Sequence, residues 1–201
     1  GMFDWSALGV PDEQMGDFQS VDYVLRQLNQ PRDKPLFLAC GIYRPHLPWY
    51  VPRKYFDLFP LDDVVLPKRL DNDLDDVGPR ARDIARRGGG YHQHVVKAGQ
   101  WKRAVQGYLA SIAFADAMFG RLLDGLDESG MRENTVVVLW SDHGWQLGEK
   151  QHWRKFSLWD NVVRSVLMIH VPQNAPGLVD GSADGRLCQR PVSLQDIYPT
   201  L

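Results

Sequence analysis

Apolar residues recur every three or four positions along one long stretch, between Gln100 and Gly130. The positions that keep this spacing are Trp101, Val105, Tyr108, Leu109, Ile112, Ala115, Phe119, Leu122, Leu123 and Leu126. This period places one apolar face along about seven turns of an α-helix. Gly130 can end such a helix. The pattern therefore predicts a long amphipathic helix that packs against the core.

A shorter helix and three strands are predicted by the other apolar patterns. The helix begins near Asp17 or Ser20, either of which can cap it, and ends before Pro31. Its apolar face carries Val21, Val24, Leu25 and Leu28. Continuous apolar runs at residues 36–41, 135–140 and 166–171 are typical of strands. The first run suits a strand that is buried on both faces.

The order of these elements predicts an α/β fold with a largely parallel sheet and flanking helices. A final helix is expected to begin near Ser193. Three strands are few for 201 residues and would leave sheet edges bare, so we expect one incomplete domain over residues 1–201.

Three segments interrupt the regular pattern. Residues 1–16 are punctuated by Gly, Asp and Pro, and we expect them to be irregular. Prolines at positions 45, 48 and 52 exclude a regular helix or a central strand and indicate a rigid loop. Residues 61–98 are polar and contain a glycine triplet at 88–90, which predicts a long excursion from the domain. Residues 99–201 carry the clearest core pattern.

The composition is that of an ordinary globular protein. Hydrophobic residues make up 44% and charged residues 24% of the chain, and the net charge is −2. This balance gives no general attraction to nucleic acid or to an anionic membrane. No apolar run approaches the roughly 20 residues of a membrane-spanning helix. Cys40 and Cys188 do not form a recognisable disulfide framework, and Cys40 is expected to pack as a small apolar residue.

Asp142 and His143 follow the run at 135–140, where a strand would end. In open α/β sheets, ligands bind beyond the carboxyl ends of the strands. A carboxylate there suits a hard divalent cation such as calcium or magnesium. The alternative is a loop Asp that caps the next turn, with His143 at the surface.

Cations and indoles are dense in the residues that follow. Lys150, His152, Arg154 and Lys155 could together hold a sulfate or phosphate group, or could form a solvated charged loop. Trp145, Trp153 and Trp159 weigh against a solvated loop, because three large aromatic side chains are seldom all exposed to solvent in one loop. These rings are either core residues or walls of a cleft that stack on a substrate ring.

Other histidines are candidates for the same site. Arg44 and His46 follow the run at 36–41, and in a parallel sheet they would lie on the same side as Asp142. His46 can act as a general acid near neutral pH, or it can simply pack on its apolar neighbours. His92 and His94 would reach the site only if the excursion folds back.

Four segments in order together resemble the sulfatase family of the alkaline-phosphatase-like superfamily, and most of all its iduronate-2-sulfatase-like branch. The segments are FLACGIYRPHLPWYVP, YLASIAFADAMFGRLLDGL, VVVLWSDHGWQLGEKQHWRKFSLWD and VSLQDIYPTL. The resemblance implies the α/β fold of that superfamily and the hydrolysis of sulfate esters with calcium and a formylglycine nucleophile. It also implies a sulfated small molecule or carbohydrate as the ligand, rather than nucleic acid or a membrane, and members of the family are often exported.

The resemblance assigns roles to individual residues. Asp142 resembles the calcium-ligand Asp of the family, and His143 takes the neighbouring ligand position. Lys155 resembles the Lys that binds a sulfate oxygen; Lys150 is its rival, although the W-x-K spacing favours Lys155. His46 resembles the His that contacts sulfate and protonates the leaving oxygen. Arg44 stands where the family has Lys. Independently of the resemblance, Trp145 and Trp153 are expected to contact the substrate as walls of the cleft.

The family's nucleophile motif, C-x-P-S-R, does not occur in these 201 residues. Nucleophilic catalysis needs its nucleophile, so we expect this chain to resemble the middle of a sulfatase and to be inactive by itself. Two alternatives stay open. The first is a non-enzymatic remnant that binds an anion or sulfated glycan on Trp49, Trp145 and Trp153; the second is a phosphoesterase of the same superfamily.

Overall fold

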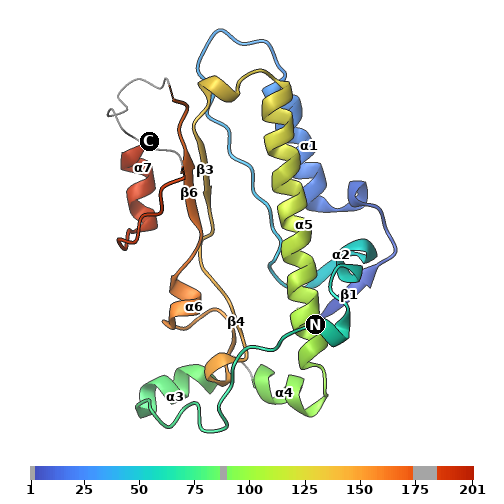
Figure 1. Ribbon diagram of the computed structural model, residues 1–201, viewed down its shortest axis with the longest axis vertical. Helices are drawn as coiled ribbons and strands as arrows, with labels where there is room; N and C mark the ends of the chain where they lie inside the picture. The colour runs from blue at the N-terminus through green and yellow to red at the C-terminus, as the bar shows by residue number, and fades with distance from the viewer. Residues whose placement is uncertain (1–2, 87–89, 174–184) are drawn as a thin grey trace.

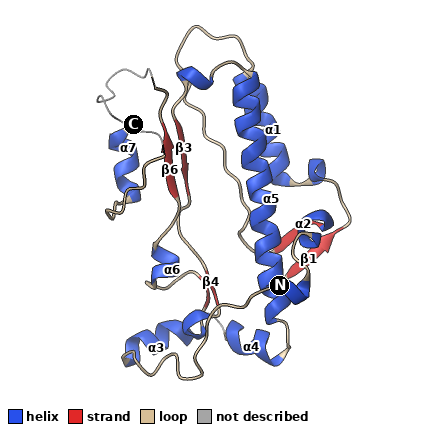
Figure 2. Ribbon diagram, viewed as in Figure 1, coloured by secondary structure: helices blue, strands red, loops and turns tan. Residues whose placement is uncertain are grey.

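The computed structural model describes residues 3–86, 90–173 and 185–201; residues 1–2, Gly88 and Gly89 of the segments discussed above lie outside the described residues. The strands are β1 (Trp5–Leu8), β2 (Trp49–Pro52), β3 (Val137–Trp140), β4 (Gln146–Leu147), β5 (Trp153–Arg154) and β6 (Leu167–His170). The α-helices are α1 (Gly16–Leu28), α2 (Arg53–Asp57), α3 (Pro79–Arg86), α4 (Tyr91–Lys97), α5 (Trp101–Glu128), α6 (Asp160–Val163) and α7 (Ile197–Thr200). Figure 2 shows that helices and long connections dominate over short strands.

The long helix predicted from the apolar period is confirmed as α5, which runs along one side of the molecule (Figure 1). Its buried stripe is displaced from the predicted one: Ile112 is 41% exposed, and the buried positions are Ala104, Val105, Gly107, Ala110, Ser111, Phe114, Met118 and Leu126. None of the described helices is long and apolar enough to cross a membrane.

The buried stripe of α5 differs from the predicted one because it contains small side chains, which let the helix pack closely on its neighbours. The helix contacts α1, α2, β1 and β2. A Cβ atom added at Gly107 would lie 2.8 Å from the Cβ of Trp5, so only glycine permits this approach of α5 to β1. The large side chains of the adjoining core cluster come from several elements and include Val21, Val51, Tyr55, Phe56 and Phe114.

The described strands form three separate pairs. Strands β1 and β2 are parallel, whereas β3 pairs with β6, and β4 with β5, in antiparallel register. The α/β class holds, but a largely parallel sheet was the wrong expectation for these pairs. The chain leaves β3, forms the β4–β5 hairpin and returns through the four-residue helix α6. The chain thus re-enters beside the end at which β3 finished, with Leu167 opposite Trp140, and β6 must run antiparallel to β3.

Two strand assignments also change. Residues 36–41 were expected to form a buried strand, but they form no strand, and Phe37 is 87% exposed. They run as an extended trace between α5 and β3 (Figure 1); a strand requires a hydrogen-bonded neighbour, and no ladder forms here. Conversely, Trp5–Leu8 forms β1 within a segment expected to be irregular. Pro52 ends β2, a strand in a two-stranded sheet, where proline is tolerated.

The remaining elements lie close to their predicted positions. Helix α1 has Met15 as its N-cap without a side-chain hydrogen bond, so neither Asp17 nor Ser20 caps it. Strands β3 and β6 fall within the predicted runs. Ser193 accepts a hydrogen bond from the amide of Gln195 and caps the turn that leads into α7. The excursion at 61–98 contains α3 and α4.

Two tyrosines in this core are expected to make the fold sensitive to alkali. Burial, aided by the Asp12 carboxylate for Tyr55 and by Glu149 for Tyr108, raises the pKa of both phenols to about 12. Unfolded tyrosine titrates near about 10. The unfolded state therefore loses protons first, and stability should fall as the pH rises from about 10 to 12.

Urea unfolding at several alkaline pH values measures this loss of stability. The loss should be smaller in Tyr108→Phe, which has one fewer buried phenol to titrate. Spectroscopic titration provides the complementary measurement. If all tyrosines ionise near their ordinary pKa while the chain stays folded, the expectation is wrong.

Candidate active site

A buried carboxylate sets the backbone of the Arg-Pro-His loop. Asp17 is 7% exposed and accepts hydrogen bonds from the amides of Tyr43 at 2.9 Å and Arg44 at 3.0 Å. A buried carboxylate without such donors would be costly. Helix α1 thus fixes the beginning of the loop that carries His46.

Arg44 is engaged within its own loop. Its Nη2 donates to the carbonyl oxygen of Tyr50 at 3.1 Å, and its guanidinium lies 5.3 Å from the centre of the Tyr43 ring. Burial lowers the pKa of Arg44, and the Asp17 carboxylate opposes that shift. These contacts orient the loop; a contact of Arg44 with substrate stays a prediction.

The imidazole of His46 is held at one nitrogen. Its Nδ1 lies 2.7 Å from the carbonyl oxygen of Leu47 and 2.8 Å from the hydroxyl of Tyr43, which itself donates to the same carbonyl at 2.9 Å. A carbonyl can only accept, so we assign the ring proton to Nδ1. In the neutral ring, Nε2 then keeps its lone pair and can take up a proton, as a residue that later protonates a leaving group must.

His143 lies between Asp142 and Lys155 beyond the end of β3. Nζ of Lys155 lies 2.7 Å from Nε2 of His143, and the nearer carboxylate oxygen of Asp142 lies 3.4 Å from the same nitrogen. Nδ1 of His143 lies 2.7 Å from the carbonyl oxygen of Gly144, to which it donates. Nε2 is therefore the acceptor for the Lys155 ammonium. The Asp142 side chain is 79% exposed, whereas that of His143 is 23% exposed.

The indole of Trp145 brings the two loops together. Its ring centre lies 6.0 Å from that of His46 and 6.1 Å from that of His143. Behind it, Tyr108 of α5 stacks at 6.2 Å and Trp49 packs edge-on at 6.1 Å. The structure thus places His46 and His143, which lie far apart in sequence, beside one half-buried aromatic ring, and Lys155 contacts His143.

The expectation that Trp153 contacts substrate requires correction. Trp153 is 1% exposed and donates its indole N–H to Nδ1 of His92 at 3.2 Å. Trp49 is 0% exposed and packs in the same cluster. Both rings are core residues, so neither can stack on a ligand. The stacking surface of the glycan-binding alternative is therefore reduced to Trp145.

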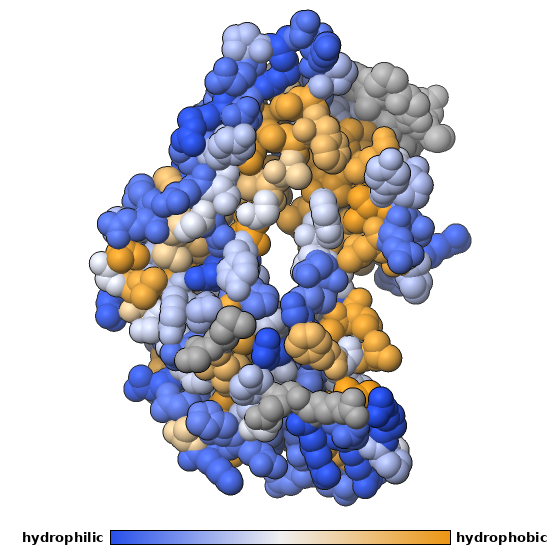
Figure 3. All heavy atoms as spheres, turned by 180° about the vertical axis from the view of Figure 1, so that it is seen from behind, coloured by the Kyte–Doolittle hydropathy of each residue, from blue (hydrophilic) through white to orange (hydrophobic). Residues whose placement is uncertain are grey.

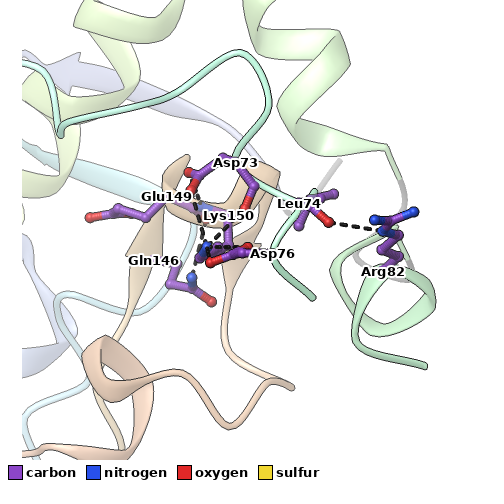
Figure 4. Close-up of polar contacts among 7 residues, drawn as sticks. All are labelled: Asp73, Leu74, Asp76, Arg82, Gln146, Glu149 and Lys150. Carbon is purple, nitrogen blue, oxygen red and sulfur yellow. Dashed lines mark hydrogen bonds and ion pairs between the residues drawn. The ribbon is translucent and has the colours of Figure 1, made fainter. Parts of the chain in front are cut away.

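The cations after β4 separate into different environments. Lys150 turns away towards the excursion, where its Nζ donates to the carbonyl of Asp73 at 2.8 Å and to the carboxylate of Asp76 at 2.8 Å (Figure 4). The Asp76 carboxylate, followed by Asp73, raises the pKa of Lys150. His152 is buried between carbonyl oxygens of Ala85 and Lys155. Lys155 is thus the cation that lies against His143.

Asp142 and His143 do not by themselves fit a calcium ion. Calcium takes about 6–8 oxygen ligands. Among residues 3–86, 90–173 and 185–201, no group of three or more His, Cys, Asp or Glu side chains could hold a metal ion. The lone pair of His143 Nε2 is also occupied by Lys155. Only the exposed carboxylate of Asp142 remains suitable.

Neither cysteine provides the expected nucleophile. Cys40 is half-buried, its pKa is raised by burial, and it is followed by Gly-Ile-Tyr. Cys188 is exposed and is followed by Gln-Arg-Pro. Neither position matches the motif from which formylglycine is made.

Three supporting residues were missed from the sequence. The sequence pattern indicates Asp17 only as a helix cap and Tyr108 only as part of an apolar stripe, and it assigns no role to Tyr43. The adjacency of Tyr43 to Arg44-Pro45-His46 was an available signal. The role of Asp17 had none, because it depends on a contact across 26 residues.

Comparison with known proteins decides the family. The family model described as Sulfatase matches residues 6–201. The chain belongs to the sulfatase family. It is 39% identical over 201 residues to a sulfatase of Formosa agariphila, covering 98% of this chain and 38% of that protein. It is 28% identical over 206 residues to human iduronate 2-sulfatase, covering 96% and 35%.

Solved structures support the sulfatase fold. A protein from a Bacteroides thetaiotaomicron locus for the metabolism of glycosaminoglycans superposes with a TM-score of 0.57 at 20% identity, over 78% of this chain and 30% of that chain. A protein solved in complex with its substrate D-glucosamine-2-N,6-O-disulfate gives 0.57 at 19% identity, over 76% and 43%. This sulfatase-family chain therefore spans little more than a third of the curated relatives it matches.

Proposed function

We propose that this chain supplies the sulfate-binding side of a site for sulfate ester hydrolysis. The observation that carries the proposal is the convergence of His46 and His143 on the Trp145 ring, at 6.0 and 6.1 Å. Lys155 lies beside them, at 2.7 Å from His143. Membership of the sulfatase family is the reason why we propose sulfate as the anion that this arrangement binds.

The His143–Lys155 contact suits the recognition of an anion. A lysine ammonium has several N–H donors. One of them is directed to His143, which restrains the side chain and leaves the others for sulfate oxygens. Charge-assisted hydrogen bonds of this kind are short and strong. Nε2 of His46 is the group that would give a proton to the leaving oxygen.

A sulfated sugar is the substrate class that we propose. Trp145 offers a half-buried ring next to His143, which contacts the Lys155 ammonium, and amphipathic rings of this kind suit the faces of sugars. The relative solved with a disulfated glucosamine is consistent with this choice. Calcium and formylglycine stay implications of the family, because the described residues do not complete a site for either group.

The test is sulfate binding by the whole chain. In isothermal titration with sodium sulfate, Lys155→Ala should weaken binding by about 10-fold or more, since a charged hydrogen bond contributes about 1.5–3 kcal/mol. Lys54→Ala is the matched control, because Lys54 is 63% exposed and paired with Asp12 elsewhere on the surface.

Hydrolysis is expected to stay at the blank rate. An aryl sulfate supplies the readout, with and without added calcium. Calcium-dependent turnover would show that the chain holds a nucleophile and would refute this part of the proposal. Equal sulfate affinity in Lys155→Ala and Lys54→Ala would refute the role of Lys155.

A further inference from the structure

A cavity of about 240 Å³ lies where the excursion meets the β4–β5 hairpin. Its walls come from the connection before α3, from α4 and from the turn between β4 and β5. The polar lining residues are Arg69, Asp71, His92, Gln93, Lys97 and Gln151. They are distinct from the residues grouped around Trp145.

The Arg69 side chain is held in a fixed position by neighbouring residues before any ligand binds. Its guanidinium lies 5.4 Å from the centre of the Trp101 ring, and Nη2 donates to the Asp71 carboxylate at 2.6 Å. The Asp71 side chain is 93% exposed, so this pair is solvated and contributes little to stability. A planar guanidinium can hold a second oxyanion with its other N–H groups. Lys97, at the end of α4, also lines the cavity, so two basic side chains there face the single carboxylate of Asp71.

His92 adds a neutral donor. Its Nδ1 accepts the indole N–H of Trp153 at 3.2 Å, so the proton of the neutral ring resides on Nε2. Burial, followed by the nearby Arg69, lowers the pKa of His92, and the Asp73 carboxylate opposes that shift. The ring is therefore neutral near neutral pH and offers an N–H without an added charge.

The contacts of Lys150 hold the third wall in place. Asp73 accepts from the backbone amide of Lys150 at 2.9 Å, while Asp76 accepts from its ammonium (Figure 4). The next residue, Gln151, has a φ of 53°, in the left-handed region that non-glycine residues seldom adopt. This ion-paired turn joins the excursion to the hairpin and fixes the Gln151 side of the cavity.

We propose that this cavity is a separate oxyanion-binding subsite, which takes a sulfate or carboxylate group through Arg69 and Lys97, with amide donors from Gln93 and Gln151. That both sites would be used by one multiply charged glycan rests on the proposed function. The binding of an oxyanion in this cavity does not, because its residues are independent of Lys155.

Nitrogen-labelled NMR spectra of the full chain test the subsite. Sodium sulfate and sodium acetate are titrated separately at constant ionic strength, and the side-chain signals of Arg69, Gln93 and Gln151 are followed. Sulfate should shift them saturably, and the double variant Arg69→Ala/Lys97→Ala should weaken the binding by about 10-fold or more. The matched control is Arg26→Ala/Lys54→Ala, whose side chains are 62% and 63% exposed. This variant removes two positive charges, as Arg69→Ala/Lys97→Ala does.

The relative affinities for sulfate and acetate show which kind of oxyanion the subsite prefers. Tighter binding of sulfate than of acetate assigns the subsite to sulfate groups, and the reverse assigns it to carboxylates. The shifts should persist in Lys155→Ala, which separates this subsite from the proposed function. Shifts that do not saturate, that survive the double variant, or that vanish in Lys155→Ala would each overturn it.

Discussion

Replacing Trp49 with alanine is expected to lower the free energy of unfolding by about 3–5 kcal/mol, the usual cost of removing a fully buried large aromatic side chain. Trp49 is 0% exposed. Its ring packs against Trp145 at 6.1 Å, Tyr108 at 5.5 Å and Trp153 at 6.4 Å. The substitution therefore removes the contact shared by β2, α5 and the β4–β5 hairpin.

The same substitution should also disturb the Arg-Pro-His loop, because the indole N–H of Trp49 donates to the carbonyl of Pro45 at 2.8 Å. Urea unfolding measures the stability. Trp49→Phe is the matched variant: it keeps most of the apolar volume but loses the hydrogen bond, so it should cost less than alanine. A loss below about 1 kcal/mol in Trp49→Ala would contradict the assignment of this ring to the core.

Replacing Gly144 with alanine is expected to displace the loop that carries Asp142 and Trp145. A Cβ atom at Gly144 would lie 2.0 Å from the carbonyl oxygen of Asn161, which is backbone and cannot rotate away. Two hydrogen bonds join the segments here, from Gly144 to Val162 at 2.7 Å and from Trp145 to Asn161 at 2.9 Å. Overpacking of this kind typically costs about 1–3 kcal/mol.

Binding should suffer together with stability in Gly144→Ala, because the displaced loop positions His143 against Lys155. We expect sulfate affinity to fall by at least about 10-fold, as for loss of a charged hydrogen bond. Gly120→Ala is the control, since apart from the adjacent backbone of its own helix nothing lies within 4 Å of the added Cβ, and alanine favours the helix. Unchanged sulfate affinity in Gly144→Ala would show that this loop takes no part in binding.

Local patterns predicted the helices of this fold better than its sheets. The period in residues 101–126 requires no knowledge of distant residues, and α5 appears where it predicts. The run at 36–41 has the composition of a strand, but composition does not supply a hydrogen-bonding neighbour. Strand β1 is the opposite case, because its local sequence does not predict a strand. It is ordered by the parallel pairing of Trp5 with Trp49, which lies 44 positions further along the chain.

The candidate site was predictable where chemistry and spacing agreed. Lys155 was preferred to Lys150 from the W-x-K spacing, and the structure places Lys155 against His143 while Asp73 and Asp76 engage Lys150. Their roles in binding stay predictions. Trp153 was misjudged because an indole in a charged segment has the same sequence signature whether it faces a ligand or the core. Tertiary packing decides between the two cases, and that information is not local.

Apolar side chains exposed on both faces of the β3–β6 pair have a consequence for how the chain behaves at high concentration. Val136, Trp140, Met168 and Ile169 are 46–56% exposed, and apolar atoms gather on this part of the surface (Figure 3). An apolar strand with a free edge is a template for adding another strand. The colloidal behaviour of the chain should therefore depend on concentration, with turbidity arising from edge-to-edge association of folded molecules rather than from unfolding.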